Sequence, residues 1–181
     1  MKPDNIELRG RSISLVGLMG VGKSTIGRRL AKRLEMPVFD SDDEIEKASG
    51  RTVKGYFKEH GESAFRSGER RVIKRLLSDD PIILSTGGGA FIPAATRKVL
   101  QQNSITVWLK ADFDTVMERV NRQRSKRPLL DVPDPEAAMR ALMDARYPIY
   151  SKAHLVVAAN ATTHGVTVEK VVESLKAYYE R

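Results

Sequence analysis

The sequence has 181 residues and carries 31 Lys and Arg against 23 Asp and Glu, which gives a net charge of +8 and an isoelectric point near 9.8. Hydrophobic residues make up 41% and charged residues 30% of the chain, a composition typical of a globular domain and unlike that of a disordered or fibrous protein. Cysteine is absent from the sequence, which excludes disulfides, thiolate nucleophiles and cysteine-ligated zinc. The length fits one domain, and the positive charge favours an anionic partner.

The amino-terminal residues show neither the apolar run of a secretory signal nor the basic amphipathic pattern of a transit peptide. The longest uncharged stretch near this end, 12–22, has 11 residues and contains three glycines. A bilayer span needs about 20 apolar residues. We therefore expect a cytoplasmic protein with no membrane partner.

Short apolar runs rich in β-branched residues alternate with longer segments of helical periodicity. Strands are predicted at 13–16, 37–39, 82–84, 105–109 and 155–158. Helices are predicted at 23–35, 43–49, 93–102, 112–123, 135–146 and 168–179, with a longer helical segment at 52–77 that has breaks at Gly55 and Gly61. This alternation indicates βαβ units, so we expect one α/β domain over 1–181 with a five-stranded, mainly parallel sheet. Ligands bind such sheets at the carboxyl ends of the strands.

Residues 17–24, GLMGVGKS, match the phosphate-binding pattern G-x-x-x-x-G-K-[ST] between a predicted strand and a predicted helix. The glycines let successive backbone N–H groups face a phosphate, and the helix adds the positive end of its dipole. In such loops the lysine, here Lys23, contacts phosphate oxygens, and the next hydroxyl, here Ser24, is a ligand of Mg²⁺. The alternative is a glycine-rich turn that binds nothing. The match favours a nucleotide but does not separate a kinase from a GTPase-like switch or a motor.

Two aspartates, Asp40 and Asp42, follow the second predicted strand. In an extended segment both carboxylates would point to the same side. One could then hold Mg²⁺ through water, and the other could accept a proton from a substrate hydroxyl. The alternative is a helix N-cap, which suits Asp42 before an acidic first turn. We favour a functional pair because the carboxyl end of a strand faces the ligand crevice.

Three further patterns are candidates for acceptor binding. Arg66 and Glu69 are three residues apart in a predicted helix, so they are surface neighbours and could form an ordinary ion pair. The triple glycine at 87–89 follows a strand and would expose backbone N–H groups to a ligand, unless it forms only a loose turn. Arg146 could cap a helix end or bind a carboxylate in a bidentate manner.

A basic run at 119–127 contains five Lys or Arg residues and no acid, and it leads into an irregular stretch with three prolines. One interpretation is a solvated helix end, where positive charge is favourable. The other is a mobile lid over about 119–135 that brings an arginine onto a transferring phosphoryl group.

Taken together, these motifs resemble those of shikimate kinase, a small P-loop kinase family of aromatic amino-acid biosynthesis. The resemblance covers nearly the whole chain and rests on GLMGVGKSTIGRRLA, Asp40-Ser-Asp42, Gly61-Glu62 with Phe65-Arg66 and Glu69, STGGGA at 85–90, RPLL at 127–130 and Arg146. It implies a three-layer P-loop NTPase fold of the nucleoside-monophosphate-kinase type, with a mobile lid and an acceptor-binding helical segment at about 42–77. The implied reaction is phosphorylation of the 3-hydroxyl of shikimate by ATP.

The resemblance also implies roles for individual residues. ATP would contact Gly20, Val21, Gly22, Lys23, Ser24, Thr25 and Arg127, with Mg²⁺ held by Ser24 and, through water, by Asp40. Shikimate would contact Asp42, Arg66, Gly87, Gly88, Gly89 and Arg146, with Phe57 and Phe65 as an apolar wall. The catalytic residues would be Lys23, Asp42 as a base for the reacting hydroxyl, and Arg127 as the lid residue that stabilises the transferred group.

The chain departs from the family pattern at two expected adenine contacts. The basic stretch before Arg127 is one residue longer than the family spacing, which affects the assignment of the adenine-flanking arginine to Arg119. The family's acidic and basic positions further on are Ala159 and Thr163 here. Adenine packing and nucleotide preference are therefore left open.

Two other functions remain as alternatives. A gluconate kinase has the same fold and phosphorylates a hydroxylated carboxylate, but Arg66, the triple glycine and RPLL argue against it. A nucleic-acid or nucleotide-switch module would account for the charge, but aromatic residues are only 6% and scattered, whereas sequence readers need stacking residues or a recognition motif. We expect ATP and Mg²⁺ as cofactors, shikimate as a small-molecule partner, no nucleic acid, and a monomer.

Overall fold

The computed structural model describes residues 10–122, 132–160 and 163–180. Its centre is a five-stranded parallel sheet with the strand order β2-β3-β1-β4-β5. The strands are β1 (Ser12–Val16), β2 (Val38–Asp40), β3 (Ile83–Ser85), β4 (Ser104–Lys110) and β5 (Leu155–Ala158). The predicted α/β class and the predicted parallel sheet are confirmed.

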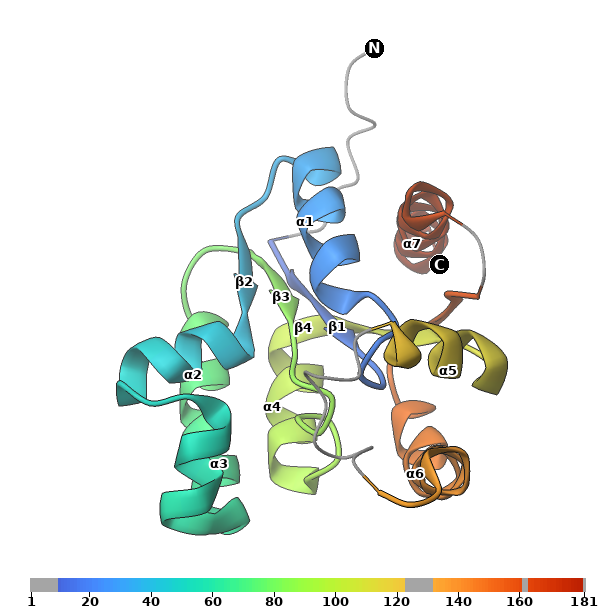
Figure 1. Ribbon diagram of the computed structural model, residues 1–181. Helices are drawn as coiled ribbons and strands as arrows, with labels where there is room; N and C mark the ends of the chain where they lie inside the picture. Colours follow the sequence, from blue (N-terminus) through green and yellow to red (C-terminus); the bar gives the residue numbers. More distant parts are fainter. Residues whose placement is uncertain (1–9, 123–131, 161–162, 181) are drawn as a thin grey trace.

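Helices cover both faces of this sheet (Figure 1). Helices α1 (Lys23–Leu34) and α7 (His164–Tyr179) pack together on one face, and α4 (Ala94–Asn103) and α6 (Pro135–Tyr150) lie on the other. Helices α2 (Ser41–Ser49) and α3 (Val53–Leu76) form a pair beside the β2 edge, and α5 (Phe113–Asn121) follows β4. The three layers agree with the architecture that the resemblance implied.

The central strands are buried because helices cover both of their faces. Ile13 and Leu15 of β1 and Ile105 and Val107 of β4 have no exposed surface. Central parallel strands are expected to be nearly continuous apolar runs for this reason. Serine hydroxyls link these two strands, since Ser104 Oγ donates to Ser14 Oγ at 2.7 Å. The sheet is thus a rigid support for the loops at its carboxyl edge.

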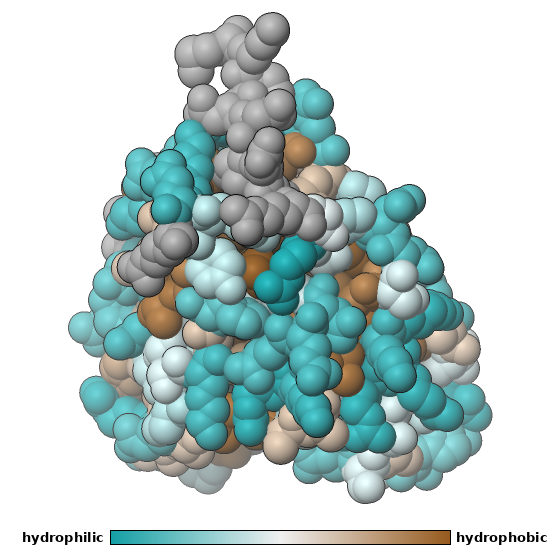
Figure 2. Space-filling model, turned by 180° about the vertical axis from the view of Figure 1, so that it is seen from behind, coloured by the Kyte–Doolittle hydropathy of each residue, from teal (hydrophilic) through white to brown (hydrophobic). Residues whose placement is uncertain are grey.

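Hydrophilic side chains predominate on the face of the molecule that Figure 2 shows. In the described ranges, the well-exposed large hydrophobic side chains are those of Val132, Val156 and Val166. Among the helices of these ranges, none combines the length and apolar character that a bilayer span requires.

The start of α2 differs from the prediction. The helix begins at Ser41, so Asp42 lies in its first turn, and the expectation of an extended segment that carries both Asp40 and Asp42 was wrong. The N-cap is Asp40, whose carboxylate accepts a hydrogen bond from the Asp42 N–H at 3.0 Å; the alternative of Asp42 as the cap was also wrong. A cap at Asp40 places three acidic residues in the first turn, where the helix dipole favours negative charge.

Only one of the two predicted breaks in α3 is present. Thr52 caps this helix, and its Oγ1 accepts a hydrogen bond from the Gly55 N–H at 3.0 Å, so Gly55 belongs to the first turn. Gly61 has φ 80° and ψ 173°, a backbone conformation that is open mainly to glycine. The kink at Gly61 separates a first half without buried residues from a second half that buries Phe65.

Helices α6 and α7 are longer than predicted. Helix α6 continues past Arg146 to Tyr150, with Pro148 inside it. Tyr150 is fully buried, with its ring centroid 5.9 Å from that of Trp108. The stabilisation from this packing outweighs the cost of the helix hydrogen bond that is lost because Pro148 has no backbone N–H. Helix α7 begins at His164 instead of Val168.

Candidate active site

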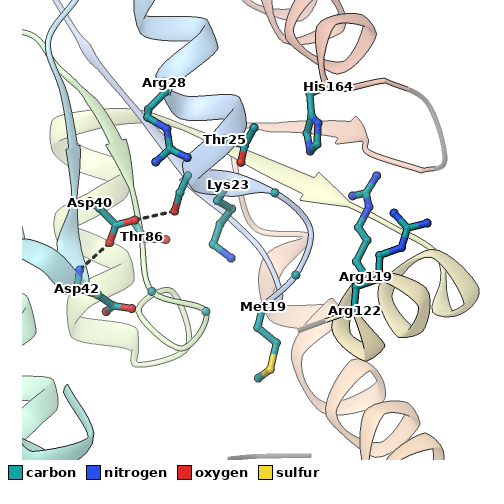
Figure 3. A pocket seen from close by; sticks show the side chains of 15 residues that line it. Met19, Lys23, Thr25, Arg28, Asp40, Asp42, Thr86, Arg119, Arg122 and His164 are labelled. Atoms are coloured by element: carbon teal, nitrogen blue, oxygen red, sulfur yellow. Dashed lines mark hydrogen bonds between the residues drawn. The ribbon is translucent and has the colours of Figure 1, made fainter. Parts of the chain in front are cut away.

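A cleft of about 590 Å³ opens where the loops after β1 and β3 meet the start of α2 (Figure 3). This volume lies within the range of roughly 300 to 1,000 Å³ that is typical of ligand pockets. The predicted site residues that line it are Gly20, Gly22, Lys23, Ser24, Thr25, Asp40, Asp42, Gly87 and Gly88. The cleft thus lies at the carboxyl edge of the sheet, where the site was expected.

The loop between β1 and α1 curls around the ammonium group of Lys23. Gly17, Gly20 and Gly22 have φ values of 141°, 81° and 94°, which favour glycine. A Cβ atom on Gly17 would lie 2.8 Å from the carbonyl oxygen of Leu109, so a side chain does not fit there. Lys23 Nζ donates to the carbonyl oxygens of Gly17 at 2.8 Å and Leu18 at 2.7 Å. The loop thus holds a buried cation at the floor of the cleft.

Oxygen atoms suited to a divalent cation lie beside this loop. Ser24 Oγ donates to Asp40 Oδ2 at 2.7 Å and lies 3.3 Å from Ser85 Oγ. Mg²⁺ prefers such hard oxygen donors and usually takes only one or two protein ligands, with phosphates and water completing its shell. In the described residues, no group of three or more His, Cys, Asp or Glu side chains is placed to hold a metal alone. Ser24 and Asp40 therefore fit a Mg²⁺ ion that arrives with a nucleotide.

Asp42 has the electrostatic properties of a base. Burial raises the pKa of Asp42 to about 6; the negative charge of Asp40 adds to this effect, and Lys23 and Arg66 oppose it. The carboxylate packs directly against the glycine turn, because a Cβ atom on Gly87 would lie 2.7 Å from its Oδ1. A carboxylate with this pKa is still ionised at neutral pH and binds a proton more strongly than an ordinary aspartate.

The guanidinium of Arg66 is held on two sides. Its Nη1 donates to Glu69 Oε2 at 2.7 Å, and Glu69 is fully buried. Its Cζ lies 5.7 Å from the ring centroid of Phe57 and 5.3 Å from that of Phe65. The ion-pair interpretation of Arg66 and Glu69 is thus confirmed, and the two predicted wall residues are neighbours, with ring centroids 4.3 Å apart. An arginine fixed in this way presents its planar donor group in one orientation.

The triple glycine at 87–89 is where the predicted acceptor residues meet. Asp42 lies against the first glycine, and Arg146 Nη1 donates to the carbonyl oxygen of the second at 3.5 Å. A Cβ atom on the third would lie 2.2 Å from Arg66 Nη2. One carboxylate and two guanidinium groups, from α2, α3 and α6, therefore converge on one turn beside the phosphate loop. This set suits a ligand with a hydroxyl and a carboxylate.

The opposite side of the cleft carries Arg119 and His164 (Figure 3). Arg119 donates to the carbonyl oxygens of Val21 at 3.0 Å and Asn160 at 3.1 Å. A Cβ atom on Gly22 would lie 3.2 Å from His164 Nε2, so the imidazole lies close to the phosphate loop. Burial, together with the positive charges of Arg119 and Arg29, lowers the pKa of His164. Two flat side chains thus border this side of the cleft.

Some lining residues were not predicted: Met19, Arg28, Thr86 and His164. Arg28 could have been found, because it follows Ser24 by one helical turn and so faces the same side of α1. His164 follows Thr163, one of the expected adenine positions, but no motif marks the histidine itself, since tertiary packing brings α7 to the phosphate loop. Arg127 and part of the predicted lid lie outside the described residues.

Comparisons with known proteins point to the same family as the motifs do. The family model for shikimate kinase matches residues 19–176. A shikimate kinase of Bradyrhizobium diazoefficiens is 50% identical over 171 residues, which cover 94% of this chain and 82% of that protein. The solved structure of shikimate kinase from Acinetobacter baumannii in complex with shikimate superposes with a TM-score of 0.88 at 35% identity, covering 96% of this chain and 97% of that one.

A gluconokinase from Sinorhizobium meliloti also superposes, with a TM-score of 0.62 at 15% identity over 94% of each chain. This likeness shows only a shared fold. The family model and the identities above are far more specific. The chain belongs to the shikimate kinase family, whose members are kinases.

Proposed function

We propose that the protein transfers the γ-phosphoryl group of ATP to the 3-hydroxyl of shikimate, giving shikimate 3-phosphate and ADP. The observation that carries the proposal is the convergence of Asp42, Arg66 and Arg146 on the triple glycine beside the phosphate loop. Membership in the family supports the reaction. The bound shikimate of the Acinetobacter baumannii enzyme supports this acceptor.

On the nucleotide side, the backbone N–H groups of 20–25 bind the phosphates, and the Lys23 ammonium exchanges the loop carbonyls for phosphate oxygens. Such an exchange needs little movement, because the ammonium already lies within the loop. Ser24 and, through water, Asp40 would hold Mg²⁺. When bound, Mg²⁺ neutralises charge on the β- and γ-phosphates. Arg127 acts from the lid on the transferred group.

On the acceptor side, Arg66 and Arg146 bind the shikimate carboxylate with the backbone of 87–89, and Phe57 and Phe65 form the apolar wall. Asp42 accepts a hydrogen bond from the 3-hydroxyl and takes its proton as the bond to phosphorus forms. Phosphoryl transfer depends mainly on positioning and on charge stabilisation. A base with a pKa of about 6 needs only to be ionised and well placed.

A coupled assay with ATP, Mg²⁺ and each acceptor tests the proposal. We expect turnover of shikimate, with the product identified by ³¹P NMR, and no comparable turnover of gluconate. Lys23→Ala is the inactive control, for which we expect a loss in kcat of several orders of magnitude with the fold retained. Turnover of gluconate without turnover of shikimate would show that the acceptor is wrong.

We further propose that the protein acts as a monomer without a nucleic-acid partner. The supporting argument is that cationic side chains gather where they suit small anions: Lys23 lines the cleft, and Arg66 and Arg146 meet at the triple glycine beside it. Sedimentation velocity tests the first point. Titration with DNA and RNA tests the second, and binding that persists at about 150 mM salt would contradict it.

A further inference from the structure

Two side chains of α6 donate to the same backbone oxygen in the triple-glycine turn. The Tyr150 hydroxyl donates to the carbonyl oxygen of Gly88, and Arg146 Nη1 donates to that oxygen at 3.5 Å. The two residues are one helical turn apart, so they lie on one face of α6. Tyr150 is fully buried, and its ring packs near those of Phe91 and Trp108. A hydroxyl of the core thus reaches the edge of the proposed acceptor site.

The peptide group that Tyr150 contacts lies between α6 and the phosphate loop. A Cβ atom on Gly88 would lie 3.3 Å from the backbone nitrogen of Met19. Because a trans peptide is planar, a carbonyl held toward α6 directs the N–H of the following residue, Gly89, to the opposite side. Tyr150 therefore sets the orientation of a backbone donor in the turn against which Arg66 also packs.

The hydroxyl also affects what Arg146 can do. The Arg146 guanidinium can turn away from Gly88 to a carboxylate ligand and form stronger, charge-assisted hydrogen bonds with it. The Gly88 carbonyl then still accepts a hydrogen bond from the Tyr150 hydroxyl. Without the hydroxyl, the same movement would leave a partly buried carbonyl unpaired, which is unfavourable. The guanidinium would then be held on Gly88 and would be less available to the ligand.

Building on the proposed function, we propose that Tyr150 is a positioning residue for the acceptor. It holds the Gly88 carbonyl so that Arg146 is released to the acceptor carboxylate and the N–H of Gly89 keeps its direction. The effect is specific to the acceptor, because the nucleotide contacts proposed above do not involve this hydroxyl.

Tyr150→Phe tests the role, because it removes the hydroxyl and keeps the packed ring. We expect the KM for shikimate to rise about 5- to 30-fold, the size of one lost buried hydrogen bond, with the KM for ATP within about twofold of wild type. Tyr147→Phe is the matched control. Tyr147 lies on the same helix and against the same Trp108, at 5.0 Å, but its hydroxyl donates to Ala111. We expect this control to leave both KM values nearly unchanged.

The Arg146→Ala background shows whether Tyr150 acts through Arg146. There we expect Tyr150→Phe to change the KM for shikimate by no more than about twofold, since its main route of action is gone. An unchanged KM for shikimate in Tyr150→Phe, or equal shifts of this KM in the Tyr150 and Tyr147 variants, would overturn the positioning role. The proposed function would still stand if the wild-type protein turns over shikimate. Absence of wild-type turnover would overturn both.

Discussion

Gly89 and Arg66 lie so close together that a Cβ atom on Gly89 would be 2.2 Å from Arg66 Nη2 and 2.9 Å from its Cζ. Gly89 does not have the positive φ that favours glycine, unlike the glycines of the phosphate loop. The requirement at this position is therefore space: the guanidinium occupies the place of the missing side chain. The third glycine of the turn and the arginine of α3 thus form one unit of the proposed acceptor site.

Gly89→Ala is predicted to displace the Arg66 guanidinium without unfolding the protein, because the clash is with the end of a flexible side chain. We expect the KM for shikimate to rise at least about tenfold, and the KM for ATP to stay within about twofold. Gly68→Ala in α3 is the control, since its Cβ would be 3.4 Å from the Tyr56 hydroxyl, an ordinary contact. A normal shikimate KM in Gly89→Ala would show that Arg66 does not bind the acceptor from this position.

The pKa of Asp42 predicts the acidic limb of the pH profile. A base must be ionised to act, so kcat/KM for shikimate should fall about tenfold per pH unit below about pH 6. Asp42→Asn should lower kcat by about 10² to 10⁴ and abolish this limb. Asp43→Asn, at the adjacent exposed position, should retain both the wild-type kcat and the acidic limb. A limb that persists in Asp42→Asn would assign the titration to another group.

The same carboxyl should make stability depend on pH. Its pKa is about 6 in the folded protein and 3.8 for an unperturbed aspartate, so folding favours the protonated form. Its stabilising contribution is present below about pH 4 and is lost as the pH rises through about 6. Asp42→Asn should therefore stabilise the protein at about pH 7.5, by up to about 3 kcal/mol, and little at about pH 4. Urea unfolding without nucleotide or Mg²⁺ measures this, and a difference independent of pH would contradict it.

Arg66→Ala should affect both binding and stability. It should weaken shikimate binding while ATP affinity persists, and it should leave the fully buried Glu69 without its ionic partner. Removal of one member of a buried pair typically costs about 3 to 5 kcal/mol. Adding Glu69→Gln should recover much of the stability but none of the shikimate binding. Calorimetric titration measures shikimate binding, and thermal unfolding measures stability. Recovery of binding in the double variant would refute the role of Arg66 in binding the shikimate carboxylate.

Local patterns were sufficient for the parts of the fold that local physics determines. The phosphate loop was predictable because its glycines, Lys23 and Ser24 occur at fixed spacing between an apolar strand and a helix. The position of the break in α3 was less predictable, because Gly55 and Gly61 are both glycines and either could interrupt the helix. The Thr52 cap, which places Gly55 in a regular first turn, distinguishes them.

The remaining parts of the site depend on contacts between distant segments. Tyr150 belongs to the aromatic core by its packing, and only the fold shows that its hydroxyl reaches Gly88. The end of α6 was misjudged for the same reason, because the burial of Tyr150 outweighs the local effect of Pro148. Residues that join a site through tertiary packing leave no spacing signal in a single sequence.

His164 lies at the side of the cleft opposite Asp42 (Figure 3). Its lowered pKa keeps the imidazole neutral at neutral pH, and a neutral flat ring near the Arg119 guanidinium is suited to packing on a nucleotide base. His164→Ala should raise the KM for ATP about 5- to 30-fold and leave the KM for shikimate unchanged. Val166→Ala, two residues further along α7 and 45% exposed, is the control. A KM for ATP equal to that of the control would exclude a role of His164 in packing on the base.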